Sequence, residues 1–211
     1  MNYLIGIIGI LIASVLTNNI ILNQSWAICP FLGVSKKMNS AFGMSIAVIF
    51  VLVLSSLICY LVNTYILDTL GIGFLSLIVN ILIIAALVQL LETLIKRFLP
   101  TLYKALGVYL PLITTNCAVL LVANNVVMEG FFASSFPAAA GAVPTDAFQV
   151  IVYALGIGLG FMLAILLMAG MRERMERADI APNFKDFPIT LITAGLLAMA
   201  FYGLAGLNFF G

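Results

Sequence analysis

Three cysteines carry the only thiols of this chain, which contains no histidine. Cys29 is followed directly by Pro30, and Cys117 is preceded by the polar run Thr-Thr-Asn at 114–116, so each thiol stands beside a helix-breaking or polar element inside an apolar stretch. Cys59 lies in a plain apolar run and is expected to be a small core residue. The lack of histidine excludes imidazole-ligated haem or zinc and every catalytic triad built on histidine.

Cys29 and Cys117 are therefore the candidates for metal or redox chemistry. A bare thiolate in hydrocarbon would take up a proton, whereas a thiolate bound to iron or another soft cation stays deprotonated. An iron–sulfur cluster normally takes four cysteine ligands, and this chain offers two good candidates. Either a partner supplies the other ligands, or the two thiols line a substrate pathway or simply pack in the core.

The composition places these thiols in a membrane protein. The 211 residues are 64% hydrophobic and only 8% charged, whereas soluble domains have about 45–50% apolar and about 25% charged residues. A net charge of +1 with nine Lys and Arg provides no basic surface for a phosphate backbone, so nucleic acid is excluded as a partner. The odd number of cysteines, all set in apolar runs, argues against a disulfide framework.

Six uncharged runs are long enough to cross a bilayer, because a hydrocarbon core of about 30 Å requires about 20 helical residues. They predict an all-α integral membrane protein with six transmembrane helices at about 3–24, 38–62, 70–92, 106–128, 147–171 and 188–209. All nine basic residues fall in the first, third and fifth loops, at Lys36, Lys37, Lys96, Arg97, Lys104, Arg172, Arg174, Arg177 and Lys185. The positive-inside rule therefore places these loops in the cytoplasm and both termini outside.

The two sets of three helices must cross the membrane in opposite senses, which is the arrangement of inverted repeats. We expect residues 1–100 to form the first three-helix repeat and residues 101–211 the second, together making one membrane domain. The first helix of each repeat is expected to be broken. In the first repeat the uncharged run is too long for one straight span, and the polar cluster 23–25 and Pro30 are its break points.

Both candidate thiols can lie at one depth in the membrane. Cys29 is seven residues from Lys36, which is about 10 Å if helical and about 23 Å if extended. Cys117 is thirteen residues from Lys104, which is about 20 Å as a helix. Because they occupy corresponding points of the two repeats, the two thiols could bind one shared group.

Four segments resemble the family of A-type membrane subunits of bacterial Rnf complexes. They are ICPFLGVSKK at 28–37, LPLITTNCAVL at 110–120, RER at 172–174 with AD at 178–179, and LITAGL at 191–196. The resemblance covers nearly the whole chain, and the two cysteine segments are its most specific part. The E-type membrane component of the sodium-translocating NADH:quinone reductase is a homologue with similar segments, but the residues around the two cysteines favour the Rnf member.

The resemblance implies a six-helix protein that pairs with a homologue of opposite orientation, the E-type Rnf subunit. Between them the pair would hold a 2Fe-2S cluster, to which each member gives two cysteines from the first helix of each half. Cys29 and Cys117 are the positions of this chain that match, as cofactor-binding and iron-ligating residues, whereas Cys59 is not part of that pattern.

The resemblance also implies a place in a larger assembly with the B-, C-, D- and G-type Rnf subunits in the bacterial cytoplasmic (inner) membrane. That complex transfers electrons between ferredoxin and NAD through flavins and further iron–sulfur clusters on other subunits, coupled to sodium or proton movement. This chain would be one part of a redox-driven translocase that relays electrons across the membrane, with no catalysis of its own. One departure from the family is an outer loop at 130–146, rich in Ala, Gly and Pro, which is longer than expected.

Gly156, Gly158 and Gly160 in the fifth expected span contain a Gly-x-x-x-Gly spacing. No strand precedes them and both flanks are apolar, so they indicate a close helix-packing face and not a nucleotide loop. The chain also has no glycine-rich phosphate loop outside the membrane, and NAD and ferredoxin must therefore dock on other subunits.

Two further hypotheses belong to other classes of protein. Inverted repeats and broken helices equally suit a secondary transporter, and a purely structural membrane scaffold is the third alternative. Colour separates the electron carrier from the transporter, because an iron–sulfur complex absorbs visible light through sulfur-to-iron charge transfer. The scaffold predicts instead that both cysteines can be replaced without consequence.

Overall fold

The computed structural model describes eight stretches of the chain. The described residues are 11–17, 19–35, 38–67, 75–98, 112, 116–127, 147–177 and 187–205. These segments form helices and the turns beside them, with no β-strand among them. The predicted all-α class is confirmed, and the outer loop at 130–146 lies outside the described residues.

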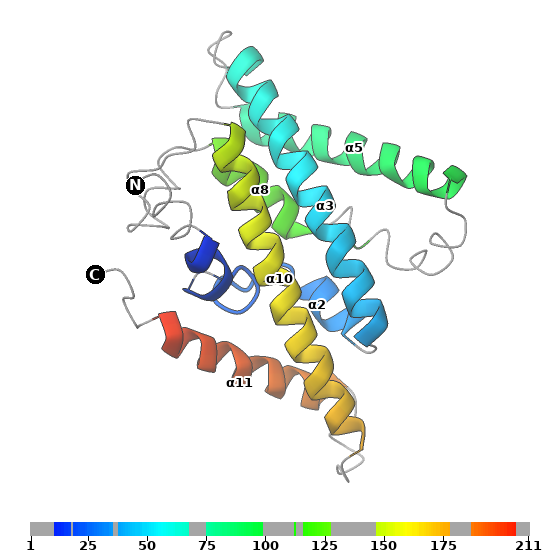
Figure 1. The fold of residues 1–211 in the computed structure, drawn as a ribbon, viewed down its shortest axis with the longest axis vertical. Helices are drawn as coiled ribbons and strands as arrows, with labels where there is room; N and C mark the ends of the chain where they lie inside the picture. Colours follow the sequence, from blue (N-terminus) through cyan, green and yellow to red (C-terminus); the bar gives the residue numbers. More distant parts are fainter. Residues whose placement is uncertain are drawn as a thin grey trace.

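The described helices differ widely in length (Figure 1). In chain order they are η1 (Ala13–Thr17), α2 (Ile28–Val34), α3 (Met38–Val62), η2 (Asn63–Leu67), α5 (Ser76–Phe98), α8 (Cys117–Val127), α10 (Ala147–Glu176) and α11 (Phe187–Ala205). The two elements named η are short π-helical segments. Among them, α3 and α10 are the longest elements and lie next to each other in the centre (Figure 1).

Three of these helices are long and apolar enough to cross a membrane, over Ser40–Leu67, Ser76–Thr93 and Phe148–Glu176. At a rise of 1.5 Å per residue, the 28 residues of the first extend about 42 Å, against a hydrocarbon core of about 30 Å. Two shorter apolar helices cover Cys117–Val126 and Phe187–Gly203. The prediction of a membrane protein is thus supported, while the count of six spans and the placing of both termini outside stay predictions.

The face that α3 turns away from the molecule is as apolar as the face that it buries. Phe42, Ile46 and Phe50, spaced by four residues, are each about half exposed, with relative accessibilities of 48%, 52% and 57%. On the inner side of the helix, Ser45 and Ser55 are buried together with the bulkier Met44 and Leu52. A helix that is apolar all round is typical of a membrane span.

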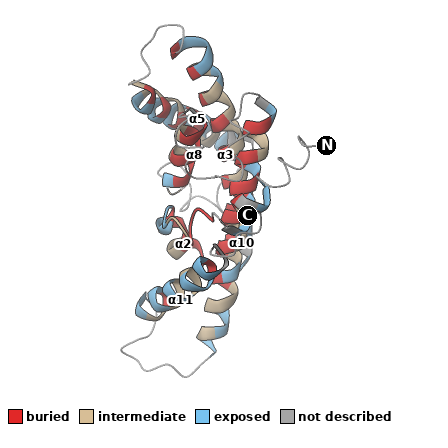
Figure 2. Cartoon of the chain, turned by 90° about the vertical axis from the view of Figure 1, so that its left-hand side faces the viewer, coloured by how far each residue is buried: buried red, intermediate tan, exposed pale blue. Residues whose placement is uncertain are grey.

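The pair of long helices is packed closely because α10 lacks a side chain at the crossing. A Cβ atom built on Gly158 would lie only 2.8 Å from Cγ1 of Ile49 on α3. Most of the buried residues in Figure 2 gather along α3, α8 and α10. The core of the molecule is therefore centred on this pair and on the shorter helices that cover it.

The shorter elements cover the central pair in a crossed pattern. η1 contacts α10 and α11, which follow much later in the chain, whereas α8 contacts α3 and α5, which precede it. α5 lies toward one end of the molecule and α11 toward the other (Figure 2). The first described element of each expected half thus packs on the second and third helices of the other half. The inverted repeat itself stays a prediction.

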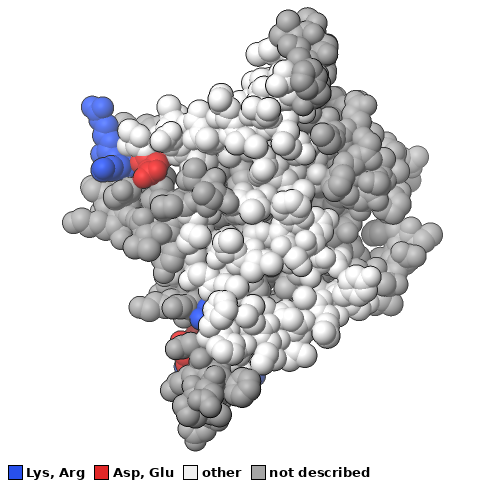
Figure 3. All heavy atoms as spheres, turned by 180° about the vertical axis from the view of Figure 1, so that it is seen from behind, with Lys and Arg blue, Asp and Glu red and all other residues white. Residues whose placement is uncertain are grey.

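Charged side chains in the described part of the chain occupy only two places (Figure 3). One is the last part of α5, with Glu92, Lys96 and Arg97, and the other is the last turns of α10. A broad surface without charge separates the two groups in this view. Such a surface is what a chain needs where it faces hydrocarbon.

Candidate cysteine site

The chain before Cys29 is not one continuous helix. η1 ends at Thr17, residues 20–24 form a turn, and α2 begins at Ile28. Ser25 and Ala27 adopt left-handed backbone angles, with φ of 59° and 61°, which costs an L-residue about 1–2 kcal/mol. The expected helix over 3–24 is therefore interrupted well before its predicted end.

The position of this interruption confirms one expected break point and corrects the other. The polar cluster 23–25 lies within the irregular segment, as predicted. Pro30 does not break a helix, because it is the third residue of α2. In the first turn of a helix the missing proline N–H removes no hydrogen bond, so proline is tolerated there.

Asn19 holds the interrupted segment together. Its Oδ1 accepts hydrogen bonds from the backbone N–H groups of Ile21, at 3.1 Å, and Leu22, at 3.3 Å. Its Nδ2 donates to the backbone oxygens of Val15, at 3.2 Å, and of Gly160 on α10, at 2.9 Å. One fully buried amide thus satisfies the turn and ties it to a distant helix.

Glycines on α10 allow this close approach. A Cβ atom on Gly156 would lie 3.1 Å from Cβ of Ser14, and one on Gly160 would lie 2.9 Å from the carbonyl oxygen of Ser14 and 3.3 Å from Cα of Val15. Since Gly158 meets α3 instead, the three glycines serve two contacts. The interpretation of the Gly-x-x-x-Gly spacing as a packing face is confirmed.

Cys29 is the second residue of α2 and is exposed. The opposite side of this seven-residue helix is buried, through Pro30, Phe31 and Val34. The N–H of Phe31 donates to the backbone oxygen of Ala27 at 3.3 Å, which closes the first turn. The helix therefore seats its apolar side on the core and presents the thiol outward.

The other end of α2 is bonded to α10 through Arg172. One guanidinium nitrogen of Arg172 donates to the backbone oxygen of Leu32 at 2.9 Å and to Oγ of Ser35 at 3.0 Å. The last carbonyl groups of a helix have no partner inside it, and a basic side chain supplies one here. The sequence indicated Arg172 as one charge of a cytoplasmic loop and as part of the RER segment, but not this contact, because a contact between residues 140 apart leaves no local pattern.

Cys117 opens the second helix of interest. Asn116 caps α8: its Oδ1 accepts from the N–H of Ala118 at 3.0 Å, and its backbone oxygen accepts from the N–H of Val119 at 3.1 Å. Cys117 is exposed, while Ala118 and Val119 are fully buried. A helix that begins at Cys117 agrees with the expected break in the second repeat, although residues 113–115 lie outside the described part.

The two cysteine segments lie near each other. A Cβ atom on Gly33, four residues after Cys29, would lie 3.8 Å from Cδ1 of Leu112, five residues before Cys117. Figure 2 shows α2 and α8 on the same side of the α3–α10 pair, and both helices contact that pair. The structure therefore brings together the elements that carry the two predicted site residues.

Cys59 differs from both other thiols. It is fully buried in the core cluster, as predicted, and its backbone oxygen accepts a hydrogen bond from Nδ2 of Asn63 at 2.8 Å. Among the described residues, no three side chains of His, Cys, Asp or Glu come together as a complete metal site. Within that part, the chain thus offers two separate exposed thiols and no full set of ligands.

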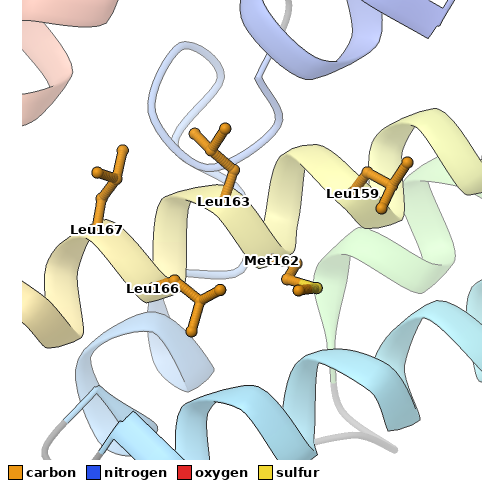
Figure 4. A pocket seen from close by; sticks show the side chains of 5 residues that line it. All are labelled: Leu159, Met162, Leu163, Leu166 and Leu167. Carbon is orange, nitrogen blue, oxygen red and sulfur yellow. The ribbon is translucent and has the colours of Figure 1, made fainter.

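A shallow hollow of about 400 Å³ runs along α10 (Figure 4). It is lined only by Leu159, Met162, Leu163, Leu166 and Leu167. Since these side chains offer no hydrogen-bond donor and only the weak acceptor of the Met162 thioether, the hollow does not favour the polar binding site that a transporter needs for its substrate.

Known proteins similar to this chain point in one direction. Residues 7–208 match the family described as "Rnf-Nqr subunit, membrane protein". The chain is 49% identical over 203 residues to the A-type subunit of the Na(+)-translocating ferredoxin:NAD(+) oxidoreductase complex of Acetobacterium woodii, an alignment that covers 96% of this chain and 98% of that protein. It is 46% identical to the A-type subunit of the ion-translocating oxidoreductase complex of Aliivibrio fischeri, over 94% of this chain and 95% of that protein. The corresponding protein of Vibrio cholerae serotype O1 strain El Tor Inaba N16961 is 44% identical, with the same coverage.

Proposed function

The chain belongs to the Rnf-Nqr family of membrane subunits, and on that basis we propose that it is the electron-transferring A-type subunit of an ion-translocating ferredoxin:NAD oxidoreductase in a bacterial cytoplasmic membrane. Its relatives are subunits of an ion-translocating oxidoreductase complex, so it is a subunit of a redox-driven translocase. The name of the Acetobacterium relative specifies sodium. Sodium or protons are the ions that we propose for this complex.

Cys29 and Cys117 are, in this proposal, half of the ligand set of a 2Fe-2S cluster. The other half comes from a homologue of opposite orientation, the E-type Rnf subunit. When bound, such a cluster supplies a one-electron carrier inside the membrane. The described donor set fits half of a shared site, because it provides two soft thiol ligands and no third residue that would complete a site within one chain.

The observation that carries this proposal is the contrast among the three thiols. Cys59 is sealed in the core, as expected of a cysteine that only fills space. Cys29 and Cys117 lie in apolar segments too, yet both are exposed and both stand in the first turn of a helix. A ligand shared with a second protein has to be exposed on its own chain.

The positions of the two thiols also suit a negatively charged group. Backbone N–H groups in the first turn of a helix have no intrahelical partner, and the helix dipole places partial positive charge there. α8, with eleven residues, is long enough to contribute such a field at Cys117. The role of this chain is to hold the two thiols inside the membrane and to exclude water from them with apolar side chains. It leaves the remaining ligand positions open to a partner.

Serine substitutions in the purified complex test the proposal. Cys29→Ser and Cys117→Ser should each abolish the electron-paramagnetic-resonance signal of the shared cluster and lower the iron content, because a serine hydroxyl has a higher pKa and is a harder ligand than a thiol. Ferredoxin-driven NAD reduction should fall to background while the complex still assembles.

Cys59→Ser is the matched control, since it makes the same chemical change in the core of the same chain. It should keep the cluster signal and cost at most a packing defect of about 1 kcal/mol. If Cys29→Ser or Cys117→Ser assembles with normal iron and normal electron transfer, these thiols are not ligands and the electron-carrier function is wrong. A colourless wild-type pair of subunits would favour the transporter instead.

A further inference from the structure

We propose that Arg172 is a positioning residue for the Cys29 thiol, acting through the C-terminal end of α2. This inference rests on the proposed function of Cys29 as a cluster ligand. The guanidinium of Arg172 bonds to the backbone of Leu32, three residues after Cys29, and to the hydroxyl of Ser35. It touches neither the thiol nor any atom that would react.

α2 cannot hold its own position. With seven residues it is shorter than the about 12–15 residues that an isolated helix needs for marginal stability. Its N-cap residue, Ala27, is left-handed and forms no side-chain capping bond. The placement of Cys29 therefore depends on tertiary contacts, which are the buried apolar side of α2 and the Arg172 bonds.

Arg172 stands on α10, the helix that packs most extensively against α3. It is carried by α10, whose preceding turn includes the buried residues Met168 and Ala169 and which packs along α3. The same helix accepts the hydrogen bond from Asn19 through Gly160. Gly160 and Arg172 thus bind the stretch of chain from the irregular segment to α2 at two points, one at Asn19 and the other at Leu32. These two points on α10 are twelve residues apart, which is about 18 Å along the helix.

This anchoring bears directly on ligand geometry. Leu32 and Cys29 are separated by about 4.5 Å along the helix axis, less than one turn. Because Leu32 and Cys29 lie within one turn of the same short helix, a shift at Leu32 also moves the thiol. Metal sites require ligand distances within about 0.2 Å, so a displacement of a few tenths of an ångström at this anchor is enough to disturb the site.

The test compares Arg172→Gln with Arg174→Gln in the whole purified complex. Both remove one positive charge from the end of α10, but Arg174 is exposed and has no bond to α2 among those of the described residues. Amide hydrogen exchange over residues 31–34 should speed up about tenfold to a hundredfold in Arg172→Gln, as expected for a lost charge-assisted hydrogen bond. Arg174→Gln should leave it unchanged.

The second measurement is the electron-paramagnetic-resonance spectrum of the cluster. Arg172→Gln should shift the g-values of the cluster or lower its occupancy. Arg172→Lys keeps a charged donor, so its g-values and cluster occupancy should lie closer to those of the wild type. Ser35→Ala removes one acceptor only and should give a smaller change of the same kind. It also serves as the test variant if Arg172→Gln does not assemble.

Each outcome decides the proposal. If amide exchange is unchanged in Arg172→Gln, or in Ser35→Ala where that variant is used instead, the Arg172 bonds do not hold α2 in place and the proposal is wrong. Faster exchange with an unaltered cluster spectrum would show that the anchor exists but does not position Cys29, which also overturns the proposal. That result is distinct from failure of the proposed function, because Cys29→Ser in an otherwise wild-type complex decides separately whether the thiol is a ligand.

Discussion

Gly160→Ala is the sharpest test of how the segment before Cys29 is seated on α10. The added methyl group would meet the carbonyl oxygen of Ser14 at 2.9 Å and Cα of Val15 at 3.3 Å. Both are backbone atoms, so they cannot rotate away as a flexible side chain would. It would also lie 3.4 Å from Nδ2 of Asn19, which now donates to the backbone oxygen of Gly160.

The expected loss of stability follows from three contributions. Replacing glycine by alanine inside a helix is in itself favourable by about 1 kcal/mol. Overpacking a tight contact costs about 1–3 kcal/mol, and loss of the Asn19 hydrogen bond costs about 1 kcal/mol more. The net effect is a destabilisation of about 1–3 kcal/mol, with the sign set by the backbone clash.

Gly195→Ala on α11 is the matched control. It is the same substitution inside a helix, but a Cβ atom on Gly195 would meet nothing within 4 Å. It should therefore stabilise the protein by about 0.5–1 kcal/mol through helix propensity alone. The two variants of the full chain in detergent should differ by about 1.5–4 kcal/mol in the free energy of unfolding, measured by titration with a denaturing detergent.

One result would refute this reasoning. If Gly160→Ala is as stable as Gly195→Ala, η1 does not approach α10 closely, and the bond between Asn19 and α10 is not part of the folded state. A destabilised Gly160→Ala that also loses cluster signal would agree with the segment as a support for Cys29, but the stability difference alone decides the packing.

Two other predictions concern the cap of α8 and the topology. Asn116→Ala should destabilise the chain by about 1 kcal/mol because it removes the capping bond to Ala118. Asn116→Ser keeps a capping oxygen, so its free energy of unfolding should lie close to that of the wild type in the same detergent titration. An equal loss of stability in both variants would mean that the cap is not formed. Reporter fusions after Lys37, Lys104 or Arg177 should show a cytoplasmic position and fusions at Asp68, Ala140 or the C-terminus an outside one, and a single clear inversion would break the six-span topology.

Much of the fold could be predicted from the sequence because membrane helices depend on properties that are local. A run without charge must be helical in hydrocarbon, since its backbone groups have no other partners. The expected spans at 38–62 and 147–171 therefore begin at the residues where α3 and α10 begin. The span expected at 70–92 is displaced, because α5 covers Ser76–Phe98 and continues past the charged residues Lys96 and Arg97. Hydropathy shows where hydrocarbon ends, but a helix can extend into water.

Parts of the site were not predictable for the opposite reason. Cys29 and Cys117 can be singled out because a proline and a Thr-Thr-Asn run adjoin them. The contacts of Asn19 with Gly160 and of Arg172 with Leu32 join residues about 140 positions apart. No periodicity or spacing in one sequence records such a pair. The prediction of a break at Pro30 is wrong because proline breaks the middle of a helix but is compatible with its first turn, and the sequence does not say which of these it occupies.

The crossed contacts between the two halves explain why such a site can form at all. Cys29 belongs to the seven-residue helix α2, which is too short to fix its own position, and Cys117 belongs to the eleven-residue helix α8, which is largely buried. α2 contacts both α3 and α10, while α8 contacts α3 and α5 of the other half. Because α3 and α10 are the most extensively packed pair and both α2 and α8 contact them, the two cysteine helices rest on one support although the thiols lie 88 residues apart in the chain. Among the described residues, helices of each expected half therefore pack on helices of the other, and separating them would remove much of the surface on which each cysteine helix rests.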